Sequence, residues 1–175
     1  MNDAQTNRGA VHHIDLSVTD VAAARPVYGL VLDFLGYAMV RDTPDVCEWD
    51  LRGREPFGVS IGIRKAKTLR PHDGYSPGLQ HLAWRVESRA AVDALHALLV
   101  EHGVPVLDPP AHYPDYSGDY YAVFFADPDG IRLEVVHAQA GSERRVLRSR
   151  PLTARRDVKG DERCVPDSLP PPCSG

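Results

Sequence analysis

The chain has 175 residues, of which 43% are hydrophobic and 25% are charged, so it is long enough for one domain with a sizeable core. A formal net charge of -4 argues against nucleic-acid binding, because such proteins carry a basic surface. No apolar run approaches the ~20 residues of a membrane span, and the polar start of the chain lacks the apolar segment of a signal peptide. The 3 cysteines lack metal-type spacing, and we therefore expect a cytoplasmic protein without disulfides.

The first half of the chain begins with a strongly alternating segment, in which His13, Asp15 and Ser17 share the polar side. Asp20 is the expected N-cap of the helix that follows, and Gly36 is expected to end it. The pattern predicts, in order, a strand at 11–18, a helix at about 20–35, and strands at about 37–42, 47–51 and 57–63.

The second half follows a polar segment at 65–77, which reads as a linker or an ordered loop. The elements predicted after it are a strand at 79–86, a helix at 88–102, a short strand at about 104–107, a loop at 108–118, and strands at 120–125 and 131–137. The last two strands are joined by Asp127-Pro128-Asp129-Gly130, whose residue types favour a tight turn.

The two halves repeat one another, because residues 13–23 align with residues 81–91. Each half has the order βαβββ, which predicts an α+β fold of two modules, at about 11–64 and 78–137, combined around a shared concave surface. We expect a domain at 11–138, a flexible N-terminus at 1–10, and a disordered tail rich in arginine and proline at 139–175.

Three side chains fall at related places in this repeat. His13 and His81 lie at the start of the matching strands, and Glu134 lies in the last strand on the side opposite Leu133. A buried carboxylate has to be paired, hydrogen-bonded or bound to a metal. Two imidazoles and one carboxylate form a set that holds a divalent metal and leaves positions open for water or substrate.

Other interpretations of these histidines stay open. A single histidine in a strand is more often a satisfied structural residue than a ligand. His12 competes with His13, although its parity places it on the apolar side of the strand. The remaining histidines fall in loops, on a helix or on an apolar strand face, so we leave them out of the site.

The doubled βαβββ order, the histidine at the start of each repeat and the closing Asp-Pro-Asp-Gly-x-Arg-Leu-Glu resemble the vicinal oxygen chelate superfamily. That superfamily includes glyoxalases, bleomycin-resistance proteins, fosfomycin-resistance transferases and extradiol dioxygenases. The resemblance covers about residues 11–137 and implies an open, cup-like mixed sheet with helices on its outer face. It also implies a homodimer, and a divalent metal ion (Fe, Mn, Zn or Ni) held by His13, His81 and Glu134.

The chain departs from each of these groups. Glyoxalase-type lyases have a further Glu on the last strand of the first repeat, where this chain offers only Gly58, Ser60 and Gly62. Fosfomycin transferases have a Thr two residues after the first His, and this chain has Asp15 there. Extradiol dioxygenases are generally longer, and bleomycin-type binders lack the metal set. The resemblance therefore leaves the reaction open.

Three further residues are candidates for catalysis. Tyr116 and Tyr121 lie in or beside a loop rich in tyrosine and proline, which is placed to close over the site and offer a phenol. Simple packing of a long connection explains this loop equally well. Glu48 is a candidate base on an early strand, and its alternative is an exposed charged position.

Two classes of function remain at this point. The first is a metal-dependent lyase, isomerase or dioxygenase that binds a small oxygenated metabolite through two adjacent oxygens and stabilises an enolate or oxyanion. The second is a protein of bleomycin-resistance type that binds or sequesters a small molecule without turnover. In both, the partner is a small molecule rather than a nucleic acid or a membrane.

Overall fold

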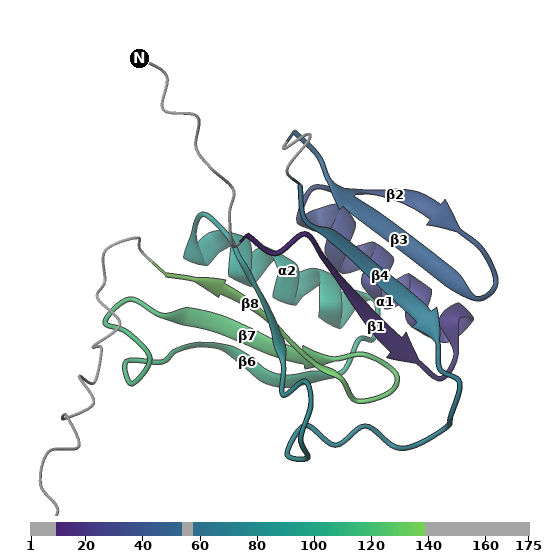
Figure 1. Ribbon diagram of the computed structural model, residues 1–175. Helices are drawn as coiled ribbons and strands as arrows, with labels where there is room; N and C mark the ends of the chain where they lie inside the picture. Colours follow the sequence, from purple (N-terminus) through teal and green to yellow (C-terminus); the bar gives the residue numbers. More distant parts are fainter. Residues whose placement is uncertain (1–9, 54–57, 139–175) are drawn as a thin grey trace, which may run out of the picture. The chain divides into compact units, whose positions relative to one another are not determined.

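The computed structural model describes residues 10–53 and 58–138. Two four-stranded sheets and two helices make up this part of the chain (Figure 1). The elements in order are β1 (His13–Val18), α1 (Val21–Phe34), β2 (Tyr37–Asp42), β3 (Val46–Leu51), β4 (Ser60–Lys65), β5 (Leu82–Arg85), α2 (Arg89–Glu101), β6 (Val106–His112), β7 (Tyr121–Ala126) and β8 (Arg132–His137).

The first module has the strand order β1-β4-β3-β2, with β1 parallel to β4 and the other neighbours antiparallel. Helix α1 connects β1 to β2 and begins where expected, because the Asp20 carboxylate accepts hydrogen bonds from the backbone N–H groups of Ala22 and Ala23 at 2.9 and 3.3 Å. It ends before Gly36, whose φ of 85° only glycine adopts readily.

The second module repeats this topology in the order β5-β8-β7-β6, with β5 parallel to β8. Ser88 caps α2 through a 3.1 Å hydrogen bond from the Ala91 N–H, and Gly103 follows the helix with a φ of 66°. The predicted α+β fold of two βαβββ modules is therefore confirmed, with each module forming its own sheet.

The core lies between the helices and one face of each sheet (Figure 1). Side chains alternate across a strand, so the odd-numbered residues Leu133 and Val135 of β8 are fully buried in this core. Glu134 lies between them and points to the other side of the sheet, which we call the helix-free face. The expected orientation of the last strand is thus confirmed, and the two helix-free faces carry the polar residues of interest.

The turn between β7 and β8 connects the second module to the first. Asp129 accepts hydrogen bonds from the backbone N–H and the hydroxyl of Thr19, just before α1. Asp127 accepts one from Tyr28 of α1. The Asp-Pro-Asp-Gly sequence thus serves as a tertiary contact as well as a turn.

Two expectations for the second module were wrong in detail. The loop expected at 108–118 is a strand as far as His112, because β6 is an edge strand of its sheet and accommodates Pro109 and Pro110 through irregular pairing. The strand expected from residue 79 begins only at Leu82, which leaves His81 immediately before it.

The flexible N-terminus expected at 1–10 lies outside the described residues except for residue 10. The disordered tail expected at 139–175 lies entirely outside them. Within the described ranges, neither helix has the length and apolar character that crossing a membrane requires.

Candidate functional site

Glu134 is the centre of the polar residues on the helix-free face of the second module. Its side chain is only 1% exposed, and its Oε2 lies 3.1 Å from Nε2 of His81. The two residues come together because β5 and β8 are parallel neighbours that pair Ala83 with Glu134, so His81 lies diagonally across on the same face. Two of the three metal ligands predicted from the sequence are therefore in contact.

Both side chains have a second partner that fixes their orientation. The Tyr120 hydroxyl donates a hydrogen bond to Oε1 of Glu134 at 2.5 Å. Nδ1 of His81 contacts the side-chain oxygen of Gln80. Each oxygen of the buried carboxylate thus has a polar neighbour, as its burial requires.

Tyr120 and Phe124 contact this pair, and two further rings contact them; we call Tyr113, Tyr116, Tyr120 and Phe124 the aromatic cluster. Tyr113 is its centre, with ring centroids 6.1, 6.5 and 5.4 Å from those of Tyr116, Tyr120 and Phe124. The Phe124 ring lies 6.3 Å from that of His81, so the cluster borders the imidazole as well as the carboxylate. Aromatic pairs at these distances are attractive beyond their apolar burial.

A positive charge lies at the edge of the aromatic cluster. The Arg132 guanidinium is 4.3 Å from the centroid of Phe124 and forms a 2.6 Å ion pair with Asp108 of β6. Burial, followed by the nearby Asp108 carboxylate, raises the pKa of Tyr113. The Tyr113 hydroxyl is therefore protonated at neutral pH, available as a hydrogen-bond donor.

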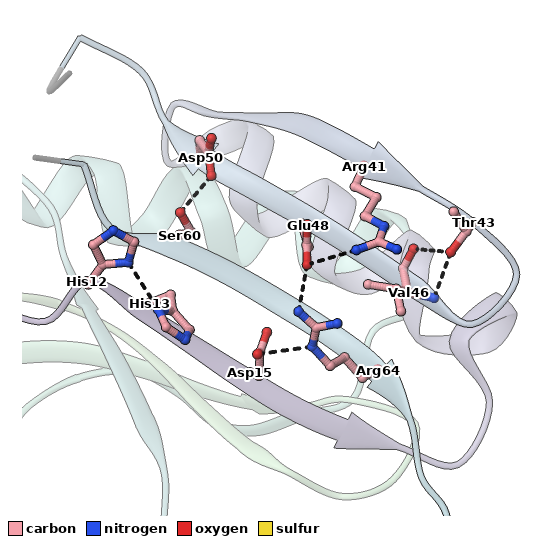
Figure 2. Close-up of polar contacts among 10 residues, drawn as sticks. All are labelled: His12, His13, Asp15, Arg41, Thr43, Val46, Glu48, Asp50, Ser60 and Arg64. Atoms are coloured by element: carbon pink, nitrogen blue, oxygen red, sulfur yellow. Dashed lines mark hydrogen bonds and ion pairs between the residues drawn. The ribbon is translucent and has the colours of Figure 1, made fainter. Parts of the chain in front are cut away.

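The helix-free face of the first module is charged rather than aromatic. Figure 2 shows Asp15 of β1, Glu48 of β3 and Arg64 of β4 pointing to the same side of the sheet. Arg64 joins the two carboxylates, with Nε 3.0 Å from Asp15 and an Nη2 contact of 2.7 Å to Glu48. These contacts, above all the hydrogen bond to Asp15, raise the pKa of Arg64.

His13, the third predicted ligand, lies on this charged face beside His12 (Figure 2). Its Nδ1 is 3.0 Å from Nδ1 of His12, so one ring donates and the other accepts. Across residues 10–53 and 58–138, no three side chains of His, Cys, Asp or Glu converge on a position suited to one metal ion. The joint binding of one metal ion by His13, His81 and Glu134 therefore stays a prediction.

The three predicted catalytic residues have different surroundings. Tyr116 belongs to the aromatic cluster and is 61% exposed. Glu48 is held by Arg64 on the charged face. Tyr121 points to the helix side, where its hydroxyl donates to Asp93 of α2 at 2.8 Å.

Tyr120 is the residue that the sequence interpretation missed. The predicted residue was its neighbour Tyr121, but the Tyr120 hydroxyl donates to Glu134 and the Tyr121 hydroxyl donates to Asp93. The signal that identifies it is parity, because Tyr120, Ala122 and Phe124 alternate with the core residues of β7.

The donor chemistry fits a divalent ion in part. An imidazole nitrogen and a buried carboxylate oxygen lie side by side on neighbouring strands, and both are ligands for Fe, Mn, Zn or Ni. The hydrogen bond from Tyr120 to the other carboxylate oxygen is the kind of outer contact that orients a metal ligand. The pair supplies two donors, so a stable site needs at least one more.

Comparison with known proteins gives a family and a fold. Residues 10–135 match the model of the Glyoxalase/Bleomycin resistance protein/Dioxygenase superfamily. The Bacillus subtilis (strain 168) protein YqjT, itself uncharacterized, is 36% identical over 128 residues, which cover 72% of this chain and 97% of that protein.

Solved structures share the fold. A Bacillus halodurans protein designated a glyoxalase superposes with a TM-score of 0.63 at 24% identity, covering 75% of this chain and 98% of the other. A glyoxalase/dioxygenase from Nostoc punctiforme superposes with a TM-score of 0.58 at 22% identity, covering 80% of this chain and 98% of the other.

Proposed function

Because the chain belongs to the glyoxalase/bleomycin resistance protein/dioxygenase superfamily, we propose that it is a divalent-metal-dependent enzyme acting on a small oxygenated metabolite. The superfamily includes lyases and dioxygenases, and the reaction proposed here is of the lyase, isomerase or dioxygenase class. The observation that carries the proposal is the 3.1 Å contact between His81 and the buried carboxylate of Glu134. A carboxylate kept 1% exposed beside an imidazole is well suited to hold a cation.

The proposed ligands are His13, His81 and Glu134, with Fe, Mn, Zn or Ni as the ion. When bound by these residues, a divalent ion would supply Lewis-acid chemistry, polarising two adjacent substrate oxygens and stabilising developing negative charge. Tyr120 holds the carboxylate of Glu134 in one orientation, and Gln80 does the same for His81. Outer contacts of this kind orient the metal ligands before the substrate binds.

The third ligand is proposed to come from a second copy of the chain. Each chain carries two half sites. One has His13 on the edge strand β1, and the other has His81, just before the edge strand β5, with Glu134 on the neighbouring strand β8. A two-fold dimer brings the first half of each chain against the second half of its partner and so forms two equal sites.

The aromatic cluster is proposed to bind the carbon skeleton of the substrate and to exclude water from the ion. Tyr116 is its most exposed member and offers both a ring face and a hydroxyl. Glu48, on the charged face, is the proposed base for a proton adjacent to the chelated oxygens. The catalytic role of Tyr121 stays a prediction, and its contact with Asp93 does not support it.

Metal content tests this proposal. Protein reconstituted in turn with each of the four ions and then dialysed is expected to retain close to one ion per chain. His81→Ala and Glu134→Gln are expected to lose it. His102→Ala is the matched control, because His102 is an exposed histidine at the end of α2. Wild-type protein that retains none of the four ions would contradict the enzyme proposal.

A mixing experiment tests the shared site. His13→Ala and Glu134→Gln proteins, each without metal, are denatured together and refolded. Half of the dimers are then mixed and hold one intact site of two, so about a quarter of the wild-type metal content returns. A mixture that stays empty, made from variants that refold and dimerise, would place all ligands in one chain.

The aromatic cluster favours a second candidate, a small-molecule binding protein without turnover. Edge-to-face and tilted aromatic rings beside a charged arginine can bind planar ligands without any metal. Retention of aromatic ligands by metal-free protein, unchanged in Glu134→Gln, would support this candidate instead of the enzyme.

A further inference from the structure

The carboxylate of Asp15 lies directly over Gly62 on the charged face. A Cβ atom added to Gly62 would overlap Oδ1 of Asp15 and lie 3.4 Å from its Cγ. Gly62 itself is buried in the middle of β4, and its φ is not of the left-handed kind that calls for glycine. The glycine is therefore explained by the space that the Asp15 carboxylate takes.

The second module also pairs a carboxylate with a small residue, but the two are on the opposite strands. In the first module, Asp15 of β1 pairs with Gly62 of β4. In the second, Ala83 of β5 pairs with Glu134 of β8, at the equivalent step of the same parallel ladder. Each module thus has one carboxylate and one small residue at this step, with the carboxylate on the first strand in one and on the last strand in the other.

Each of the two carboxylates has one oxygen bound by a side-chain donor, although the Glu134 side chain is 1% exposed and the Asp15 side chain is 36% exposed. One oxygen of Glu134 accepts the Tyr120 hydroxyl at 2.5 Å, and the other faces His81. One oxygen of Asp15 accepts Arg64 Nε at 3.0 Å, and the other lies over Gly62. In both cases a donor from another segment of the module contacts one oxygen, and the second oxygen also lies on the helix-free face.

We propose that Asp15 supplies a fourth ligand to the divalent ion, so that His13 and Asp15 form the first-module half of the site as His81 and Glu134 form the second. The inference rests on the proposed metal site. His13 and Asp15 are two residues apart in β1, so their side chains point to the same face. In the first module the carboxylate comes from β1 because β4 has only glycine at the paired position.

Charge and coordination both agree with this assignment. Two imidazoles and one carboxylate leave a divalent ion with a net positive charge, and a second carboxylate neutralises it. In an octahedral ion, four protein ligands leave two positions, enough for a substrate that binds through two adjacent oxygens. Arg64 then plays the orienting part for Asp15 that Tyr120 plays for Glu134.

Titration of wild-type, Asp15→Asn and Gly62→Ala proteins with Co²⁺ against a competing chelator tests the proposal. Asp15→Asn keeps the shape and removes the charged ligand. Gly62→Ala keeps Asp15 and introduces a methyl group into the space of its carboxylate. Both are expected to weaken Co²⁺ binding by at least about ten-fold and to change the visible absorption of the bound ion, which reports its ligand set.

The matched control is Asp50→Asn, because Asp50 lies on the same charged face but bonds to Ser60 at 2.7 Å (Figure 2). Wild-type affinity in both Asp15→Asn and Gly62→Ala, with binding lost in Glu134→Gln, would overturn the role of Asp15 and leave the metal site standing. If Asp15→Asn weakens Co²⁺ binding and Gly62→Ala does not, the proposal that Asp15 binds the ion from its place over Gly62 would be overturned. Wild-type protein that binds no ion would overturn both proposals. Circular dichroism of each variant checks that it is folded.

Discussion

The hydroxyl of Tyr28 donates a 3.0 Å hydrogen bond to Oδ2 of Asp127, joining helix α1 of the first module to the β7–β8 turn of the second. Tyr28 is fully buried and Asp127 is 2% exposed. The other carboxylate oxygen accepts the backbone N–H groups of Asp129 and Ile131 at 3.0 and 2.8 Å. A charged group inside the protein is thereby fully hydrogen-bonded, and burial together with Asp127 raises the pKa of Tyr28 well above its usual range.

Tyr28→Phe is expected to lower the free energy of unfolding by about 1.5–3 kcal/mol, the typical contribution of a hydrogen bond to a charged group. The substitution removes a hydrogen bond from the buried Asp127 carboxylate, and no water takes the place of the lost hydroxyl. Tyr121→Phe is the matched control, because its partner Asp93 is exposed and is rehydrated when the hydroxyl is removed. Urea unfolding measures both, and equal effects would contradict the structural role of Tyr28.

The stability of the protein is expected to depend on pH through Asp127. Burial is the largest effect on this carboxyl and raises its pKa from 3.8 in the unfolded chain. The folded state therefore holds the proton more tightly, so the contribution to stability is greatest below pH 3.8 and falls as pH rises through the folded-state pKa.

Urea unfolding of wild-type and Asp127→Asn proteins over a pH series measures this dependence, because the asparagine removes the titrating group. The unfolding free energy of the wild type, relative to that of Asp127→Asn, is expected to decrease as pH increases. Asp73→Asn is a control of opposite sign, because hydrogen bonds from Ser76 and Tyr75 lower the pKa of Asp73. A flat difference for Asp127→Asn would show that its pKa is the same in both states.

Tyr120→Phe is expected to weaken divalent-metal binding by about 10- to 100-fold, as loss of an outer partner of a metal ligand commonly does. The hydroxyl holds Oε1 of Glu134, and without it the carboxylate loses one fixed orientation. Competition with a chelator measures the affinity.

Tyr116→Phe is the control for this prediction, because Tyr116 belongs to the same aromatic cluster and its ring stays in place. Equal affinities of the Tyr120→Phe and wild-type proteins would remove Tyr120 from the metal site. An equal loss in both variants would assign the effect to the cluster as a whole.

Features that depend on neighbouring residues were predicted well. Asp20 caps its helix as expected, and Glu134 points away from the core because Leu133 and Val135 point into it. The repeat between residues 13–23 and 81–91 predicted two modules of the same topology, which the strand orders confirm. Local alternation and helix-end chemistry depend on a few adjacent residues, so they can be predicted from the sequence alone.

Other features depend on which strands are neighbours and in what register. Tyr120 rather than Tyr121 reaches Glu134, and the Asp15 carboxylate fills the space over Gly62, because strands far apart in the sequence pair at particular residues. A shift of one residue would exchange every one of these contacts. The sequence by itself determined the repeated βαβββ plan and the carboxylate in its last strand. The tertiary structure decided which donors surround that carboxylate, since register and packing between distant segments set those distances.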